Sequence, residues 1–121
     1  ALLAAQSVTF PVEKVIGLAA ITDPATYAKG ANSCQTATPQ FFNGMPDELA
    51  EAYAAATPDV ASIEAPVILL QGDADAIVPV TQGQLAGSEV IISEGAGHFD
   101  WLHSQTPAYQ LLLDQLLEGA E

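Results

Sequence analysis

Two short segments of this sequence carry side chains suited to acid–base chemistry. The segment GDADAIVP at 72–79 holds two carboxylates, and the segment EGAGHFD at 94–100 holds the imidazole of His98 behind two glycines. A carboxylate that hydrogen-bonds one ring nitrogen of a histidine fixes the tautomer and orientation of the ring, so the other nitrogen can act as a general base. The residue types therefore predict an acid–base pair in which Asp73 or Asp75 orients His98.

Each of these segments follows a short apolar run that is predicted to be a strand. Runs of this kind stand at 15–21 (VIGLAAI), 67–71 (VILLQ) and 90–93 (VIIS), and they are nearly continuous in apolar character rather than alternating. Such runs are typical of parallel strands that are covered on both faces. Because ligands and catalytic groups collect at the carboxyl ends of parallel strands, the aspartates and His98 should meet at one edge of the sheet.

Three helical segments are predicted around these strands. The start of the chain, ALLAAQS, has the character of the end of a helix. A helix is predicted over 46–56, since Pro46 suits a first turn, two acidic residues follow it, and Pro58 enforces an end. The C-terminal helix is predicted to open at Pro107, with Thr106 as its cap. Its apolar stripe, which is expected to pack in the core, consists of Tyr109, Leu112, Leu113, Leu116 and Leu117.

The order of these elements predicts the α/β class, with three parallel strands and flanking helices in one domain over 1–121. The connection at 80–88 has room for one or two helical turns and is short for a parallel crossover. An antiparallel pair of strands would instead send Asp75 and His98 to opposite edges of the sheet. Residues 22–44, which contain two prolines and several Thr, Asn, Ser and Gly residues, are expected to be irregular.

The composition limits the partners that the chain is expected to have. Fifteen acidic residues against two basic ones give a net charge of −13, which repels phosphate backbones and anionic lipid, so neither nucleic acid nor a membrane surface is an expected partner. The absence of arginine removes the usual clamp for carboxylates and phosphates, which favours a neutral or cationic substrate. The single cysteine, Cys34, cannot form an intrachain disulfide, so no oxidising compartment is indicated and a cytoplasmic location is favoured.

The two chemical segments resemble the last third of an α/β-hydrolase domain, especially in the esterase and prolyl-oligopeptidase-like branch. In that family a strand is followed by G-x-x-D-x-x-V-P, a crossover, another strand, G-x-G-H and a final helix, and the matching motifs here are GDADAIVP (72–79) and GAGH (95–98). The stretches KVIGLAAITDP and FFNGMPDELAEAYAAATP also resemble family segments, so the resemblance covers most of the chain. It implies that Asp75, at the fourth position of its motif, is the acid of a catalytic triad and that His98 is the base.

The nucleophile of that family is the serine of a G-x-S-x-G elbow, which precedes the acid and the base in the chain. This sequence contains no such pentapeptide. The resemblance implies that the serine and the oxyanion hole belong to a segment shortly before Ala1, so residues 1–121 would be a partial domain, the C-terminal half of the fold. Ser33 and Cys34 lack flanking glycines and a strand-to-helix turn that would expose them, and Ser7 ends the helix tail, so all three are expected to be structural.

The resemblance thus implies a serine hydrolase that acts on a small-molecule carboxylic ester or amide and needs no cofactor. The chain alone is expected to be nearly inactive, because it would lack both the nucleophile and the oxyanion hole. The alternative is a non-catalytic half-domain that forms a homo-oligomer or pairs with an N-terminal half of the same fold through its open sheet edge and uncovered apolar face. Both interpretations can hold for one molecule.

A metal site is the remaining alternative for the second chemical segment. Its candidate ligands within ten residues are Glu94, His98, Asp100 and His103. Their spacing fits no zinc motif and apolar residues fill the positions between them, so no metal is expected. Phe99 and Trp101 are expected to pack beneath the histidine turn, with an acyl pocket as the other role considered, and His103 is expected at the surface or at the entry of the final helix.

Overall fold

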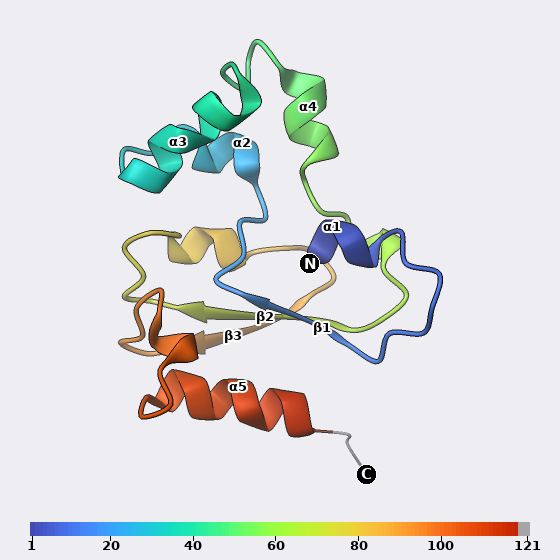
Figure 1. The fold of residues 1–121 in the computed structure, drawn as a ribbon, viewed down its shortest axis with the longest axis vertical. Coiled ribbons are helices and arrows are strands. Elements are labelled where there is room, and N and C mark those ends of the chain that lie inside the picture. The colour runs from blue at the N-terminus through green and yellow to red at the C-terminus, as the bar shows by residue number, and fades with distance from the viewer. Residues whose placement is uncertain (119–121) are drawn as a thin grey trace.

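Three parallel strands form an open sheet at the centre of the computed structural model, which describes residues 1–118 of the 121-residue chain. The strands are β1 (Val15–Leu18), β2 (Val67–Gly72) and β3 (Glu89–Ser93), in the spatial order β1-β2-β3 (Figure 1). Gly72 lies opposite Ser93 in the strand register, so the chain leaves β2 and β3 at the same edge of the sheet. The predicted α/β class and the parallel arrangement are confirmed.

The first strand is shorter than predicted, because the backbone turns at Ala19. This residue has a φ of 45°, in the left-handed region, although its N–H still donates to Leu70 O at 2.9 Å. An L-residue in this region is disfavoured by about 1–2 kcal/mol, so tertiary contacts hold the bend against local preference. Residues 20–23 then leave the sheet and lead to the helices above it in Figure 1.

The central strand β2 is buried on both faces, which explains its continuous apolar sequence. Burial of a side chain the size of Val, Leu or Ile contributes about 1.5–3 kcal/mol, so β2 anchors both layers of the core. The cluster on one face contains Leu2, Val15, Ile63, Val67 and Leu69. The cluster on the other face contains Ile68, Leu70, Ala96, Trp101 and Ala108.

The C-terminal helix α5 (Pro107–Leu117) lies along the second face of the sheet (Figure 1). It begins as predicted, with the Thr106 side chain accepting from the backbone N–H of Tyr109. The predicted apolar stripe is wrong in its outer part, because Leu116 and Leu117 are 52% and 67% exposed. The α5 side chains in or against the second core cluster are Ala108, Leu111 and Leu112, of which only Leu112 was in the predicted stripe. Among residues 1–118, no helix combines the length and apolar character that crossing a membrane requires.

The other two predicted helices are present but short. Helix α1 (Leu2–Ala5) places Leu2 in the first core cluster, against β1. Helix α4 (Ala50–Ala55) begins four residues later than predicted, because residues 46–49 form a turn. In that turn the N–H groups of Glu48 and Leu49 donate to Met45 O, and the Glu48 carboxylate accepts from Met45 N.

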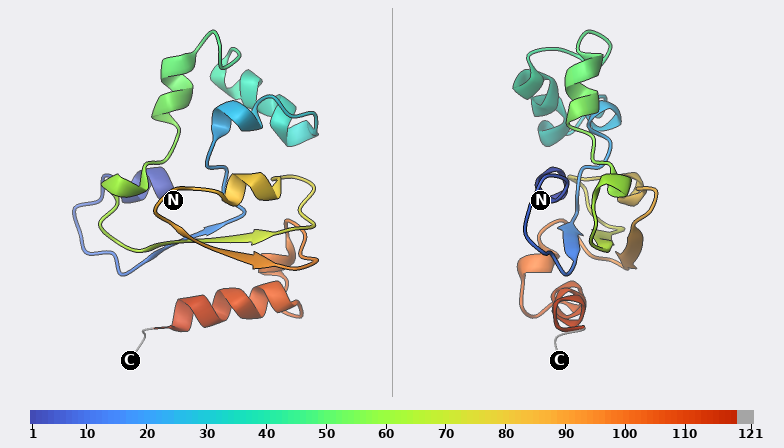
Figure 2. Two further views of the ribbon diagram at one scale, coloured as in Figure 1. Left: turned by 180° about the vertical axis from the view of Figure 1, so that it is seen from behind. Right: turned by 90° about the vertical axis from the view of Figure 1, so that its right-hand side faces the viewer.

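The expectation that residues 22–44 are irregular is wrong, since they contain helices α2 (Pro24–Tyr27) and α3 (Ser33–Phe42). Asp23 caps α2 by accepting from Thr26 N, and Asn32 caps α3. The prolines and the polar residues therefore serve as helix starts and caps, which their composition alone does not reveal. Helices α2, α3 and α4 project from the sheet on the side opposite α5 (Figure 1), and the views in Figure 2 show the same separation.

The short crossover between β2 and β3 contains one turn, the 3₁₀ helix η2 (Val80–Gly83). The side chain of Gln82 is buried there and joins η2 to the segment after β1. Its Oε1 accepts from Thr22 N at 2.9 Å and from Asp23 N at 2.8 Å, while its Nε2 donates to Asp23 O. Because buried polar groups are usually hydrogen-bonded and leaving one unpaired is costly, these contacts stabilise the point where the chain enters α2.

Two buried tyrosines predict a loss of stability at alkaline pH. Burial raises the pKa of both Tyr27 and Tyr53 above the ordinary 10.0, and the charges of Cys34 and Asp75 raise the pKa of Tyr27 further. A raised pKa means that the folded chain binds more protons than the unfolded one above pH 10, so stability is retained below that pH and falls above it. We expect the urea midpoint to be flat just below about pH 10 and to fall above it, less steeply in Tyr27→Phe. An alkaline slope that is the same in Tyr27→Phe would contradict the role of Tyr27.

Candidate active site

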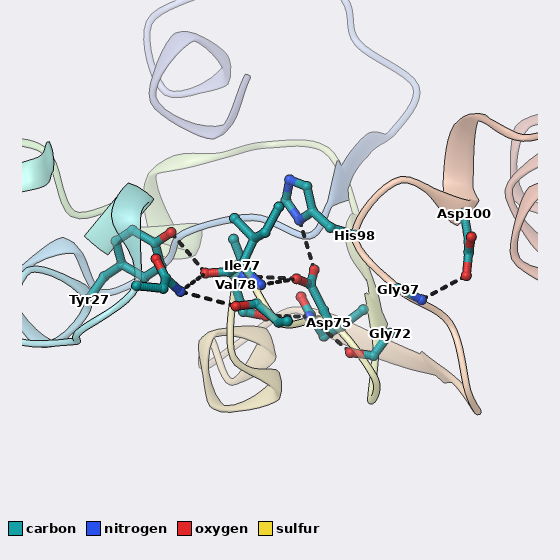
Figure 3. Close-up of polar contacts among 11 residues, drawn as sticks. Tyr27, Gly72, Asp75, Ile77, Val78, Gly97, His98 and Asp100 are labelled. Carbon is teal, nitrogen blue, oxygen red and sulfur yellow. Dashed lines mark hydrogen bonds and ion pairs between the residues drawn. The ribbon is translucent and has the colours of Figure 1, made fainter. Parts of the chain in front are cut away.

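The structure brings Asp75 and His98 into direct contact at the carboxyl edge of β2 and β3 (Figure 3). The Nδ1 atom of His98 lies 2.8 Å from Oδ2 of Asp75. The Asp75 side chain is fully buried, whereas that of His98 is 26% exposed. The contact expected from the strand order is therefore confirmed, and its catalytic role stays a prediction.

The loop after β2 folds around the Asp75 carboxylate. Oδ1 of Asp75 accepts from the N–H groups of Ile77 and Val78, each at 2.8 Å. A buried carboxylate needs such donors, because without hydrogen bonds its loss of water would be costly. Asp75 thus shapes its own loop, as aspartates in turns commonly do, and it orients the histidine as well.

The two oxygens of Asp75 have separate tasks, which assigns the tautomer of His98. Since Oδ1 is occupied by backbone donors, Oδ2 is left to accept from the ring, and Nδ1 therefore carries the proton. The lone pair then lies on Nε2, which points away from Asp75 (Figure 3). This nitrogen has the position and the electron pair that a general base requires.

The other candidate acid, Asp73, has a different task. It is exposed, and its Oδ1 accepts from Gly95 N at 2.6 Å. This contact ties the turn after β3 to the end of β2. Of the two carboxylates that the sequence offered, only Asp75 is hydrogen-bonded to His98 in the structure.

Glycines allow the two loops to approach one another closely. A Cβ atom at Gly72 would lie 2.1 Å from Ala96 O, which also accepts from Ala74 N. Gly95 has a φ of 71°, a conformation that favours glycine. At Gly97 the space does not require glycine, because a Cβ there would meet only the Asp100 carboxylate, at 3.7 Å.

The two aromatic residues beside the histidine lie in opposite environments. Trp101 is 1% exposed and packs in the second core cluster, as predicted. Phe99 is 66% exposed, so the prediction that it packs beneath the turn is wrong. The reason is the 3₁₀ helix η3 (Asp100–Leu102), which turns Trp101 inward and leaves Phe99 outside, with its ring 4.9 Å from that of His98 and nearly perpendicular to it.

The alternative nucleophiles within the chain do not contact the histidine. Ser33 and Cys34 lie in the first turn of α3 and are exposed at the surface, and α3 follows α2 rather than a strand, so neither residue stands in a strand-to-helix turn. Ser7 is exposed after α1 and donates to Ala4 O. Within residues 1–118, the only side chain that is hydrogen-bonded to His98 is that of Asp75.

The candidate metal ligands are not gathered around a common point. Among the described residues, no group of three or more His, Cys, Asp or Glu side chains could hold a metal ion. Asp100 instead accepts from Gly97 N, and His103 is exposed after η3. The backbone oxygen of His103 accepts from the hydroxyl of Thr106, which places His103 just before the final helix.

Two residues of this site were missed by the sequence reasoning, because they lie in the segment that was expected to be irregular. Asn32 and Tyr27 donate to backbone oxygens of the Asp75 loop, and Figure 3 shows the Tyr27 hydroxyl directed toward Ile77. The N-x-x-Q spacing of Asn32 and Gln35, a capping box, was the available signal for α3. The ring of Tyr27 also lines a largely apolar cavity of about 350 Å³ between α2, α3 and α4.

A search of known protein families and of curated proteins finds no match to this chain. The class that the structure itself defines is a small α/β protein with three parallel strands in an open sheet and flanking helices.

Proposed function

We propose that this chain carries the acid and the base of a serine hydrolase of the α/β-hydrolase type, which acts on carboxylic esters or amides. The observation that carries the proposal is the buried Asp75 carboxylate hydrogen-bonded to Nδ1 of His98 at the carboxyl edge of adjacent parallel strands. The motif resemblance supports the same assignment. The serine would come from a G-x-S-x-G elbow outside the 121 residues, and we call this chain together with that segment the assembled hydrolase.

In the assembled hydrolase the two residues have distinct roles. The serine oxygen adds to the carbonyl carbon of the substrate while Nε2 of His98 takes the hydroxyl proton. The resulting imidazolium, which Asp75 stabilises, gives this proton to the leaving alcohol or amine as its bond to the carbonyl carbon breaks. Water then attacks the acyl-serine with the same help from His98, which releases the carboxylic acid and restores the serine.

A second candidate function, that of a pairing half-domain, is favoured by the free edge of β1. Within the described residues β1 pairs only with β2, so its other edge has unused hydrogen-bonding groups. A cavity of about 350 Å³ lies along this strand, lined by apolar residues of α1 and β1 and by Ile21 and Pro58. Leu3 and Ile21 at its border are 44% and 41% exposed. A strand added here would extend the sheet on the side of β1.

A serine-reactive phosphonate tests both candidates. We expect no labelling of the 121-residue chain, because its serines have no hydrogen bond to His98. Labelling should appear when the segment that precedes Ala1 in the gene is included, and also when that segment is added as a separate polypeptide that pairs with β1. His98→Ala should abolish labelling in either format, since the serine then has no base.

Three outcomes would contradict these assignments. Labelling of the 121-residue chain alone would show that a nucleophile lies within it. An upstream sequence without G-x-S-x-G, or an assembled protein that is labelled equally well with His98→Ala, would remove the basis for the hydrolase.

A further inference from the structure

Two peptide groups of the Asp75 loop are held from both sides. On one side, the N–H groups of Ile77 and Val78 point to Oδ1 of Asp75. The carbonyl oxygens of the same peptide groups belong to Ala76 and Ile77. Because a trans peptide is planar and its O and H atoms point in opposite directions, whatever fixes these oxygens also aims the N–H groups at the carboxylate.

Side chains from α2 and α3 fix those oxygens. Nδ2 of Asn32 donates to Ala76 O at 3.1 Å and to Ile77 O at 2.9 Å. The hydroxyl of Tyr27 donates to Ile77 O as well, also at 2.9 Å. Figure 3 shows the Asp75 carboxylate and the Tyr27 hydroxyl on opposite sides of this backbone. A carbonyl that accepts hydrogen bonds also makes the N–H of its peptide group a better donor.

We propose that Asn32 and Tyr27 are positioning residues for the acid–base pair. They act through the loop backbone. Their side chains hold the loop carbonyl oxygens, and the N–H groups of the same peptides then hold Oδ1 of Asp75. Oδ2 of Asp75 is thereby left facing Nδ1 of His98. The placement of α2 and α3 thereby sets the geometry of the pair. This inference rests on the proposed function in so far as the pair acts as acid and base.

The burial of the participating groups supports a tether rather than an incidental contact. Tyr27 is only 2% exposed, and the Asp75 side chain is fully buried. Ala76 itself is exposed, but Val78 is buried in a cluster with Tyr27 and Ala19, and Ile77 packs against that cluster, so apolar contacts support the hydrogen bonds here. The residues that are joined lie 44 to 50 positions apart in the chain, so the tether forms only when α2 and α3 are docked.

Two substitutions remove the tether while leaving its neighbours intact. Tyr27→Phe removes only the hydroxyl. Asn32→Ser removes the amide donor. The serine hydroxyl oxygen can still cap α3 by accepting from Gln35 N, as Oδ1 of Asn32 does now. Gln35→Ala is the matched control. It removes the other hydrogen bond of the capping box, in which Asn32 N donates to Gln35 Oε1, and it leaves the bonds to the loop carbonyls unchanged.

The readout is the NMR signature of the His98 ring in the 121-residue protein, with the exposed His103 as an internal reference. In the wild type we expect a downfield Nδ1 proton and ring ¹⁵N shifts of the Nδ1–H tautomer. In the double variant Tyr27→Phe/Asn32→Ser, exchange of this proton with water should be roughly tenfold faster, which is the change expected when about one net hydrogen bond is lost. Tyr27→Phe alone should show a smaller change in the same direction, and Gln35→Ala should show the wild-type ring signals.

The outcomes separate this inference from the proposed function. Wild-type ring signals in a folded double variant would overturn the positioning role, and so would an equal change in Gln35→Ala, since the stability of α3 would then explain the effect. The NMR readout needs neither substrate nor nucleophile, so it stands if the phosphonate experiment fails. In the assembled hydrolase the double variant should lose kcat with little change in KM, and an unchanged kcat would overturn the inference alone.

Discussion

An Asp75→Asn variant of the assembled hydrolase is expected to lose about 10⁴-fold in kcat while it remains folded. The two backbone donors decide this outcome. The N–H groups of Ile77 and Val78 require an acceptor where Oδ1 now lies, so the asparagine must place its amide oxygen there. Its NH₂ group then faces Nδ1 of His98 in place of the carboxylate oxygen.

This geometry would invert the tautomer of the histidine. Facing an NH₂ donor, Nδ1 must give up its proton and accept, so the proton moves to Nε2 and the base has no lone pair toward the serine. The ring ¹⁵N shifts should report the exchange of tautomers directly, even in the 121-residue chain. The size of the effect on kcat follows from losing the base while keeping the oxyanion hole and substrate binding.

Asp73→Asn is the matched control for this prediction. The Asp73 carboxylate is exposed and accepts one bond from Gly95 N, and an asparagine oxygen can accept the same bond. We expect a change of less than tenfold in kcat and the wild-type tautomer of His98, in keeping with the small effect of a neutral replacement at the surface. If Asp73→Asn impaired kcat as much as Asp75→Asn, the acid would have been misassigned.

The sheet and the acid–base contact could be predicted because their determinants are local in the sequence. Continuous apolar character identifies β2 as a strand that is buried on both faces, and glycine and aspartate mark its end. Once β2 and β3 are parallel neighbours, Asp75 and His98 have to leave the same edge. Topology therefore predicted that an aspartate of the loop after β2 would meet His98, whereas the choice of Asp75 over Asp73 came from the motif resemblance.

The parts that were missed depend on tertiary contacts. The side of α5 that packs carries Ala108 and Leu111 beside Leu112, whereas the sequence pattern favoured a stripe that ends at the exposed Leu116 and Leu117. The bonds from Asn32 and Tyr27 to the acid loop join distant segments, and no periodicity within either segment encodes them. The contacts that hold the Asp75 loop from outside were therefore not predicted from the sequence.

A Gly72→Ala substitution is expected to lower the free energy of unfolding by about 3 kcal/mol and to separate the acid–base pair. The added Cβ would lie 2.1 Å from Ala96 O and 2.8 Å from Ala96 C, and both are backbone atoms that cannot rotate away. Relief requires the loop after β3 to move. That movement stretches the bond from Ala74 N to Ala96 O and carries His98, two residues further along, away from Asp75.

Three glycines of the same edge give a graded test of this argument by urea unfolding, followed through the fluorescence of Trp101, the only tryptophan in the chain. Gly97→Ala should change stability by no more than about 0.5 kcal/mol, because a Cβ at Gly97 meets only a carboxylate at 3.7 Å. Gly95→Ala should cost about 1–2 kcal/mol, the penalty for a left-handed alanine at a φ of 71°. Gly72→Ala should exceed both, and it alone should abolish the downfield Nδ1 proton of His98. Equal costs at Gly72 and Gly97 would show that the loops adjust freely, and the contact between Ala96 and β2 would then not position the histidine.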